Sequence, residues 1–202
     1  ANTITLSNNT PARDHHAFTG WCLGLTTNTN GVDSCFTDDG TGNPSSTPGT
    51  VFQPGDSFGI DDTISNISTL YAMWTIDAYS CSAEYRLQNA DGTYPSTYTS
   101  AGVISSAINY GDTCSYTSNQ DTTYYVNQSD TQTVTGTTVI QLDIPRTTFE
   151  LTVTKNDTWI TSAKATMTAG ANSGTEATSG TFRWGEAVAI SATPVKNGKF
   201  SS

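Results

Sequence analysis

Short runs of β-branched and aromatic residues, separated by clusters of Gly, Asn, Asp, Pro and Ser, recur along the whole sequence. Branching at Cβ restricts χ1 and packs well on a pleated surface, so these runs favour strands, and the clusters between them favour turns. No long segment has the 3.6-residue apolar period of a helix. We therefore expect an all-β fold of small β-grasp-like or sandwich-like units in tandem, with a minor helix at most near residues 99–108. The predicted strands cover residues 4–6, 16–23, 68–76, 82–88, 122–128, 131–144, 149–155, 160–167 and 187–195.

Four cysteines, which allow three pairings, further constrain the chain. The pairing of Cys22 with Cys35 and of Cys81 with Cys114 is preferred, because each bond then lies within one predicted unit and closes a loop of modest length. The cysteines lack the close CxxC spacing of a zinc site. Paired cysteines in small domains are typical of an oxidising compartment, so we expect an extracellular protein.

Charge and hydropathy argue against nucleic acid binding and against a membrane-spanning segment. The net charge of −10, with only eight Lys and Arg, would repel a phosphate backbone, so nucleic acid binding is not expected. The sequence also has no apolar run of membrane-spanning length and no N-terminal signal peptide, and it begins with Ala1. We expect no membrane-spanning segment in this stretch.

The first 76 residues contain FTGW (18–21), VFQPGDSF (51–58) and STLYAMW (68–74) in that order. This order resembles the second half of the internalin B-repeat, also called the Listeria-Bacteroides repeat. The segments ELTVTK (150–155) and TFRWGEAVAISATPVKNGKFSS (181–202) resemble a divergent form of the same repeat. The resemblance implies that the first repeat lacks its opening strand and that the last one stops before its closing tryptophan.

The middle segment EYRLQNADGTYP (84–95) is similar to mucin-binding-protein-like and related β-grasp repeats of bacterial surface proteins. We therefore expect three units: a B-repeat-like unit over residues 1–76, a β-rich unit with Cys81–Cys114 over 77–147, and a divergent B-repeat-like unit over 148–202. The junction of the second and third units contains Pro145 and Arg146, and its shortness predicts a stiff connection.

The histidine pair in HHAFTGWCLG (15–24) does not favour a metal site. Adjacent residues of a strand point to opposite faces, so His15 and His16 would not share one ion, and Cys22 has a local disulfide partner. In FTGW, Phe18 and Trp21 would lie on opposite faces of a regular strand, unless a bulge at Gly20 turns both toward one side. We read this stretch as a loop that enters a strand.

Other chemistry-bearing residues give weak patterns. Two acidic clusters offer oxygen ligands for calcium without the spacing of an EF-hand, scattered glutamates lack the pairing of a glycosidase, and no GxSxG elbow is present. Aromatic pairs could stack on sugars, and one lysine-containing group could form an isopeptide crosslink. The residues considered are Asp38, Asp39, Gly40, Asn43, Asp61 and Asp62 for calcium; Glu84, Glu150, Glu176 and Glu186 for hydrolysis; Trp159 with Trp184, or Tyr124 with Tyr125, for sugars; and Lys155, Lys164, Glu150 and Asn172 for a crosslink. We predict no catalytic, metal or cofactor site.

The resemblance implies a non-enzymatic protein of the bacterial cell surface that acts as an adhesive stalk or spacer in cell attachment. Its expected partners are a protein or glycan of a host or neighbouring cell, and further copies of the chain. Two alternatives remain open. One is a subunit of an extracellular filament assembled by strand exchange, and the other is a carbohydrate-binding module of a larger secreted protein.

Overall fold

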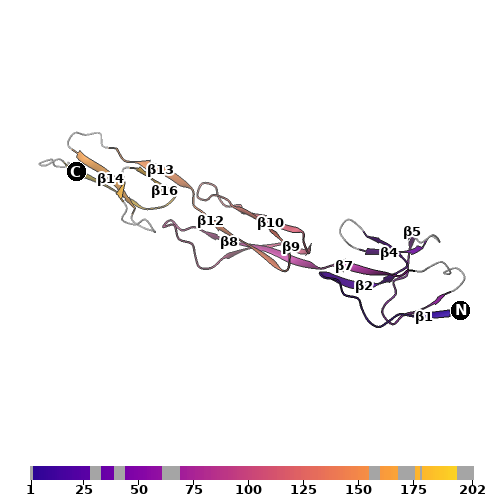
Figure 1. Cartoon of the computed structure of the whole chain (residues 1–202). Helices are drawn as coiled ribbons and strands as arrows, with labels where there is room; N and C mark the ends of the chain where they lie inside the picture. The colour runs from indigo at the N-terminus through magenta and orange to yellow at the C-terminus, as the bar shows by residue number, and fades with distance from the viewer. Residues whose placement is uncertain are drawn as a thin grey trace. The chain divides into compact units, whose positions relative to one another are not determined.

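A computed structural model describes the chain over residues 2–27, 33–38, 44–60, 69–154, 160–167, 176–177 and 179–194 (Figure 1). The described residues form strands, turns and loops and contain no helix, which confirms the all-β prediction. The chain divides into two compact units. Ala1–Tyr79 with Ala107–Asp112 makes up the first, and Ser80–Ser106 with Thr113–Ser202 makes up the second. The predicted division after residue 147 therefore lies inside the second unit.

The first unit contains three small sheets. Strands β1 and β6 pair in one, β2 and β7 pair in another, and β3, β4 and β5 form the third in that order. All pairings in these sheets are antiparallel. The strands are β1 (Asn2–Thr5), β2 (His16–Cys22), β3 (Gly24–Thr27), β4 (Asp33–Asp38), β5 (Pro44–Pro48), β6 (Ser57–Ile60) and β7 (Tyr71–Ile76).

The second unit contains four sheets, with the orders β12-β8-β9, β10-β11, β13-β16 and β15-β14-β17. Strands β8 and β9 extend by a few residues into the first unit. The strands are β8 (Ala78–Leu87), β9 (Thr99–Asn109), β10 (Thr113–Thr117), β11 (Ser129–Thr133), β12 (Thr138–Ile144), β13 (Thr148–Thr152), β14 (Ile160–Met167), β15 (Glu176–Ala177), β16 (Ser179–Arg183) and β17 (Val188–Pro194).

Strand β12 forms the centre of the core in the second unit. It pairs in parallel with β8, and its residues alternate strictly between buried and exposed. Ile140, Leu142 and Ile144 therefore face inward, while Val139, Gln141 and Asp143 face solvent, as the two-residue period of a strand requires. Strands β10 and β11 contact β12, so the inward side chains lie between two small sheets. Ala83 and Val134 are buried with them.

A β-bulge at Gly20 shapes the core of the first unit. The register of β2 against β7 shifts between Phe18 and Gly20, and Gly20 has a φ of 145°. Both aromatic residues of FTGW then turn to one side, which is one of the two arrangements that the sequence left open. The ring of Phe18 lies 5.3 Å from that of Trp21 and 5.7 Å from that of Trp74, measured between centroids.

The structure corrects two sequence predictions. The minor helix expected near residues 99–108 is absent, because this segment forms strand β9, where Val103, Ile104 and Ile108 are β-branched and Gly102 has a φ of 101°. The strand expected over residues 122–128 is a turn followed by an irregular segment. There the Asp121 carboxylate accepts a hydrogen bond from the Thr123 backbone N–H at 2.8 Å, which starts a turn instead of a ladder.

Candidate functional site: the Arg146 junction and the disulfides

Within the second unit, Arg146 holds together the end of β12 and the turn between β16 and β17. Its Nε donates to the Gln88 carbonyl oxygen at 2.8 Å, and its Nη1 donates to the Trp184 carbonyl oxygen at 3.0 Å. Its backbone N–H donates to Oε1 of Gln88 at 3.1 Å. The guanidinium carbon also lies 5.3 Å from the centre of the Tyr125 ring, in the geometry of a cation–π contact.

Backbone hydrogen bonds reinforce this junction on both sides. The Thr147 N–H donates to the Tyr124 carbonyl at 2.9 Å, and the Trp184 N–H donates to the Thr147 carbonyl at 2.8 Å. The Val126 N–H donates to the Pro145 carbonyl at 2.9 Å. The segment between β12 and β13 is therefore paired to neighbouring backbone and is not a free linker. The sequence predicted a boundary between two units at Pro145 and Arg146, whereas the contacts of Arg146 depend on the carbonyls that the fold places around it within the second unit.

The sugar-binding pairs suggested by the sequence are rearranged at the same junction. Tyr124 contacts Trp184 with ring centroids 5.5 Å apart and an interplanar angle of 65°. Both rings are exposed, whereas Tyr125 is half-buried under Arg146. Trp159 lies outside the described residues. The structure thus brings together one member of each suggested pair.

We expect Arg146→Ala to loosen the junction without unfolding the sheets. The change leaves the Gln88 and Trp184 carbonyls without their guanidinium donors, which costs about 1–3 kcal/mol of local stability. Amide hydrogen exchange at Thr147 and Trp184 should accelerate by at least about tenfold. Arg86→Ala is the matched control, because Arg86 lies on the same unit and contacts neither carbonyl. Equal protection of Thr147 and Trp184 in both variants would contradict the assigned role of Arg146.

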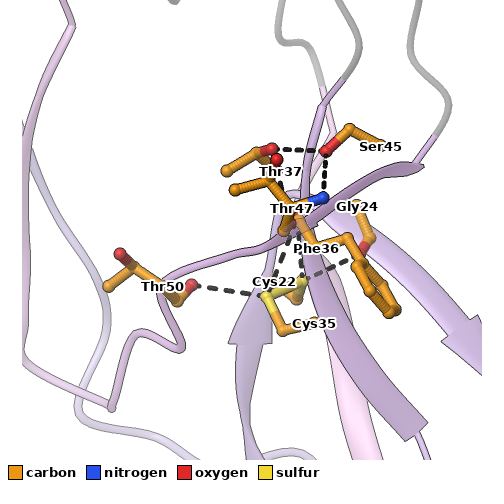
Figure 2. The surroundings of a disulfide bond; sticks show 8 residues. All are labelled: Cys22, Gly24, Cys35, Phe36, Thr37, Ser45, Thr47 and Thr50. Atoms are coloured by element: carbon orange, nitrogen blue, oxygen red, sulfur yellow. Dashed lines mark hydrogen bonds between the residues drawn. A yellow bond between two sulfur atoms is a disulfide. The ribbon is translucent and has the colours of Figure 1, made fainter.

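The Cys22–Cys35 disulfide joins β2 to β4, and so connects two different sheets of the first unit. Figure 2 shows its surroundings, in which the Gly24 and Thr50 carbonyl oxygens lie 3.1 and 3.4 Å from the sulfur atoms of Cys22 and Cys35. Beside it, the hydroxyls of Thr37 and Ser45 share a hydrogen bond of 2.5 Å across β4 and β5. The bond therefore lies where β2 meets the three-stranded sheet.

Asp33 adds a second link between the same two sheets. Its Oδ2 accepts a hydrogen bond from the Trp74 backbone N–H at 2.7 Å, which connects β4 to β7. Its Oδ1 accepts from the Thr27 hydroxyl at 2.6 Å. The sequence analysis missed this residue, because an isolated aspartate next to a turn carries no signal that its carboxylate reaches a strand forty residues away.

The Cys81–Cys114 disulfide joins β8 to β10 in the second unit, with a Cα–Cα distance of 6.6 Å. Both cysteines are fully buried, and the bond links the sheet of β8 to the sheet of β10 and β11. Both disulfides are those that the sequence predicted. Two disulfides in small β-rich units are typical of proteins that fold in an oxidising environment.

The two adjacent histidines make separate contacts. The His15 ring stacks on Tyr110 at a centroid distance of 3.5 Å, and its φ of 56° sets it in a turn. The His16 Nδ1 lies 2.7 Å from the Asp14 carbonyl, to which it donates a hydrogen bond. Each ring thus has a structural partner of its own.

An exposed ion pair lies on the β8–β12 ladder. Arg86 Nε and Nη2 donate to the two oxygens of Asp143 at 2.8 and 2.5 Å, and the guanidinium lies over the rings of Tyr94 and Tyr98. Hydrogen bonds from Arg86 hold the pKa of the Asp143 carboxyl below its usual value. Hydrogen bonds from Thr93 do the same for the pKa of Asp91, and those from Thr123 for the pKa of Asp121.

These lowered pKa values predict a loss of stability in acid. A carboxyl whose pKa is lower in the folded state stabilises the fold above its unfolded pKa of about 4, and that contribution disappears as the pH falls through the folded pKa. We therefore expect the urea midpoint to stay constant from pH 7 to about pH 5 and to fall below about pH 4. In Asp143→Asn the difference between the midpoints at pH 7 and pH 3 should shrink by the equivalent of less than about 1 kcal/mol, because the pair is exposed. A midpoint that rises on acidification would contradict this assignment.

Several sequence candidates have no described side chain. Most of the calcium candidates lie outside the described residues, as do Trp159 and two members of the crosslink group. The side chains of Asp38, Lys164 and Glu176 are also outside the description. Glu150 accepts a hydrogen bond from the Thr181 hydroxyl across β13 and β16.

Within the described ranges, no three His, Cys, Asp or Glu side chains are grouped to hold a metal ion. The same ranges hold no helix that is long and apolar enough to cross a bilayer. The candidates outside the description are Asp39, Gly40, Asn43, Asp61, Asp62, Lys155, Trp159 and Asn172.

No protein-family model, no curated protein and no solved structure matches the chain. The internalin B-repeat resemblance therefore stays a prediction from the quoted motifs.

Proposed function

We propose that the chain is a non-enzymatic stalk or spacer segment of a bacterial cell-surface protein that serves in cell attachment. The observation that carries this proposal is the Arg146 junction. There, three side-chain or backbone donors of one residue tie the end of β12 to Gln88 and to Trp184. A spacer needs joints that resist bending, and a joint made of hydrogen-bonded backbone bends less readily than a solvated linker.

The disulfides support the same function. Each connects two different sheets, Cys22–Cys35 in the first unit and Cys81–Cys114 in the second. Small β units bury little apolar surface, so covalent links between sheets stabilise them in the dilute, unprotected conditions outside a cell. A covalent link also prevents the sheets it joins from separating under tension.

The described titratable groups support a non-enzymatic function. The carboxyls with lowered pKa values are Asp91, which is half-buried, and Asp121 and Asp143, which are exposed. They acquire their shifts from turn or ion-pair hydrogen bonds. None of these shifts comes from burial beside a nucleophile, which is the usual environment of a catalytic acid or base. The local contacts explain the shifts as structural.

A deletion in the native gene tests the proposal. In cells that produce the protein naturally, residues 1–202 are replaced by a Gly/Ser linker of equal length, and attachment to host or neighbouring cells is counted. A flexible Gly/Ser chain does not hold its ends at a fixed separation, as a segment of hydrogen-bonded and disulfide-linked sheets would, so attachment should fall by at least about fivefold. Attachment equal to that of unmodified cells, with equal surface display of the flanking protein, would overturn the proposal.

A carbohydrate-binding module is the second candidate, and the exposed Tyr124–Trp184 pair favours it. Exposed aromatic faces can stack on the apolar faces of sugar rings. On a glycan array, a binding module should give signals that Trp184→Ala abolishes and that Tyr71→Ala, which removes another exposed aromatic ring, leaves unchanged. An array without signal above background would exclude this candidate.

A further inference from the structure

Strands β8 and β12 of the second unit lie side by side and run in the same direction (Figure 1). Seven residue pairs form their ladder, from Cys81 opposite Thr138 to Leu87 opposite Ile144. The chain enters β8 at the Cys81 end of the ladder and leaves β12 at the Ile144 end. A pull on the flanking chain therefore acts on opposite ends of two parallel strands and loads the ladder in shear.

The direction of loading decides how much force such a ladder can bear. When two strands are pulled apart from the same end, their hydrogen bonds break one after another, and each step needs only the force that opens one bond. When parallel strands are pulled from opposite ends, they separate only by sliding, and the evenly spaced hydrogen bonds share the load at once. Forced unfolding is governed by the rate of the rupture step, so a higher barrier to sliding gives a higher rupture force.

Side chains on both faces of the ladder also oppose sliding. On the exposed face, Gln141 Nε2 donates to Glu84 Oε1 at 2.7 Å. Further along the same face, Arg86 donates to both carboxylate oxygens of Asp143 at 2.8 and 2.5 Å. On the inward face, every second residue of β12 is buried. A slide of β12 past β8 would break both polar pairs and would displace the buried side chains from their packing.

The Cys81–Cys114 disulfide lies at the end of the ladder where tension enters β8. The bond closes a loop over residues 82–113, which includes β9, so tension cannot extend this loop after the ladder has separated. Once β12 slides free, only residues 114–144 can straighten, which lengthens the chain by at most about 110 Å. Without the bond, residues 81–144 would straighten to at most about 230 Å. The bond therefore limits the extension that follows a rupture.

We propose that the β8–β12 ladder is the tension-bearing clamp of the second unit and that Cys81–Cys114 is its extension stop. The inference rests on the proposed stalk function, because a segment that connects two bodies is pulled from both of its flanks. The clamp resists separation through backbone hydrogen bonds, two polar side-chain pairs and buried core contacts that are loaded together. It keeps the second unit folded while an attached cell pulls on the stalk.

Single-molecule pulling on the full 202-residue chain tests the proposal, with handles on azide-bearing residues that leave the cysteines paired. Handles at Ala78 and Thr148, which are both exposed, load the ladder in shear. Handles at the exposed Ser96 and at Thr148 are the matched control. Arg86 Nη1 donates to the carbonyl oxygen of the neighbouring Pro95 at 3.2 Å, so this second geometry pulls near the C-terminal ends of both strands and peels the same ladder. At equal loading rate, we expect the rupture force to be at least about twofold higher in shear.

The length released at each rupture tests the extension stop. With the disulfide intact, a shear rupture should lengthen the chain by at most about 110 Å. Equal rupture forces in the two geometries would overturn the clamp, and longer releases with the disulfide intact would overturn the stop. Both handle variants are first compared with the unmodified chain by thermal unfolding, and a handle that destabilises the fold at Ser96 is moved to the exposed Thr97.

Failure of the clamp and failure of the stalk function give different results. The ratio of rupture forces is measured on the purified chain and does not depend on attachment. Equal rupture forces together with reduced attachment after the Gly/Ser replacement would overturn the clamp alone. Unchanged attachment after that replacement would overturn the stalk function, and with it the tension that the clamp is proposed to bear.

Discussion

We expect the replacement of both Cys81 and Cys114 with alanine to lower the free energy of unfolding of the second unit by about 4 kcal/mol. The bond closes a loop with a sequence separation of 33 residues, and cross-linking a loop of this length removes about that much conformational free energy from the unfolded chain. Both cysteines are buried, so the change also removes packed atoms from the core. A loss of this size approaches the whole stability of a small domain.

Urea unfolding of the double variant measures this effect, since single cysteine variants would leave a reactive thiol. The matched control replaces Cys22 and Cys35, which are separated by 13 residues, and should cost about 3 kcal/mol because the loop is shorter. Its effect should appear in the first unit. An unchanged unfolding midpoint after removal of Cys81–Cys114 would contradict the view that this bond stabilises the two packed sheets.

Gly20→Ala should destabilise the first unit by about 3 kcal/mol. The φ of 145° at Gly20 is one that L-residues rarely adopt, which costs about 1–3 kcal/mol. A Cβ there would also lie 2.4 Å from Cγ1 of Val51 and 3.0 Å from the Phe52 carbonyl oxygen. That oxygen is fixed, because Phe52 exchanges backbone hydrogen bonds with Trp21 at 2.8 and 3.0 Å.

Gly59→Ala is the matched control for this prediction. Gly59 lies in β6, and a Cβ at this position would meet nothing within 4 Å, so the change should be neutral or stabilise by up to about 0.5 kcal/mol. Combining Gly20→Ala with Val51→Ala removes the closest contact and should restore part of the loss, with the backbone strain remaining. Thermal unfolding measures all three variants. Equal melting temperatures for the Gly20 and Gly59 variants would contradict the role assigned to the bulge.

The sequence predicted the features that depend on local chemistry. The run over 131–144 was predicted as one strand; the structure divides it into β11 and the alternating, half-buried strand β12. The positions of the cysteines predicted both disulfides. The bulge at Gly20 was one of two arrangements that the sequence left open, because a regular strand would place Phe18 and Trp21 on opposite faces.

The sequence predictions that were wrong or incomplete concern segments whose structure depends on competing local interactions or on partners far away in the sequence. The aromatic run over 122–128 has strong β propensity, but at its start the Asp121 carboxylate accepts a hydrogen bond from the Thr123 backbone N–H, which favours a turn. The hydrogen bonds of Arg146 could not be predicted from the sequence, because its carbonyl partners belong to segments about 40 and 60 residues away. The parallel pairing of β12 with β8 also has no local signal, since the two strands are far apart in sequence.

Immunolabelling of intact cells that produce the protein naturally tests the central claim most directly. Antibodies raised against the folded 202-residue chain are applied before and after permeabilisation, and an antibody against a cytoplasmic protein controls for intact cells. The stalk proposal predicts equal labelling in both conditions, because the chain is displayed on the outer surface. Labelling that appears only after permeabilisation would place the protein inside the cell and contradict the proposal.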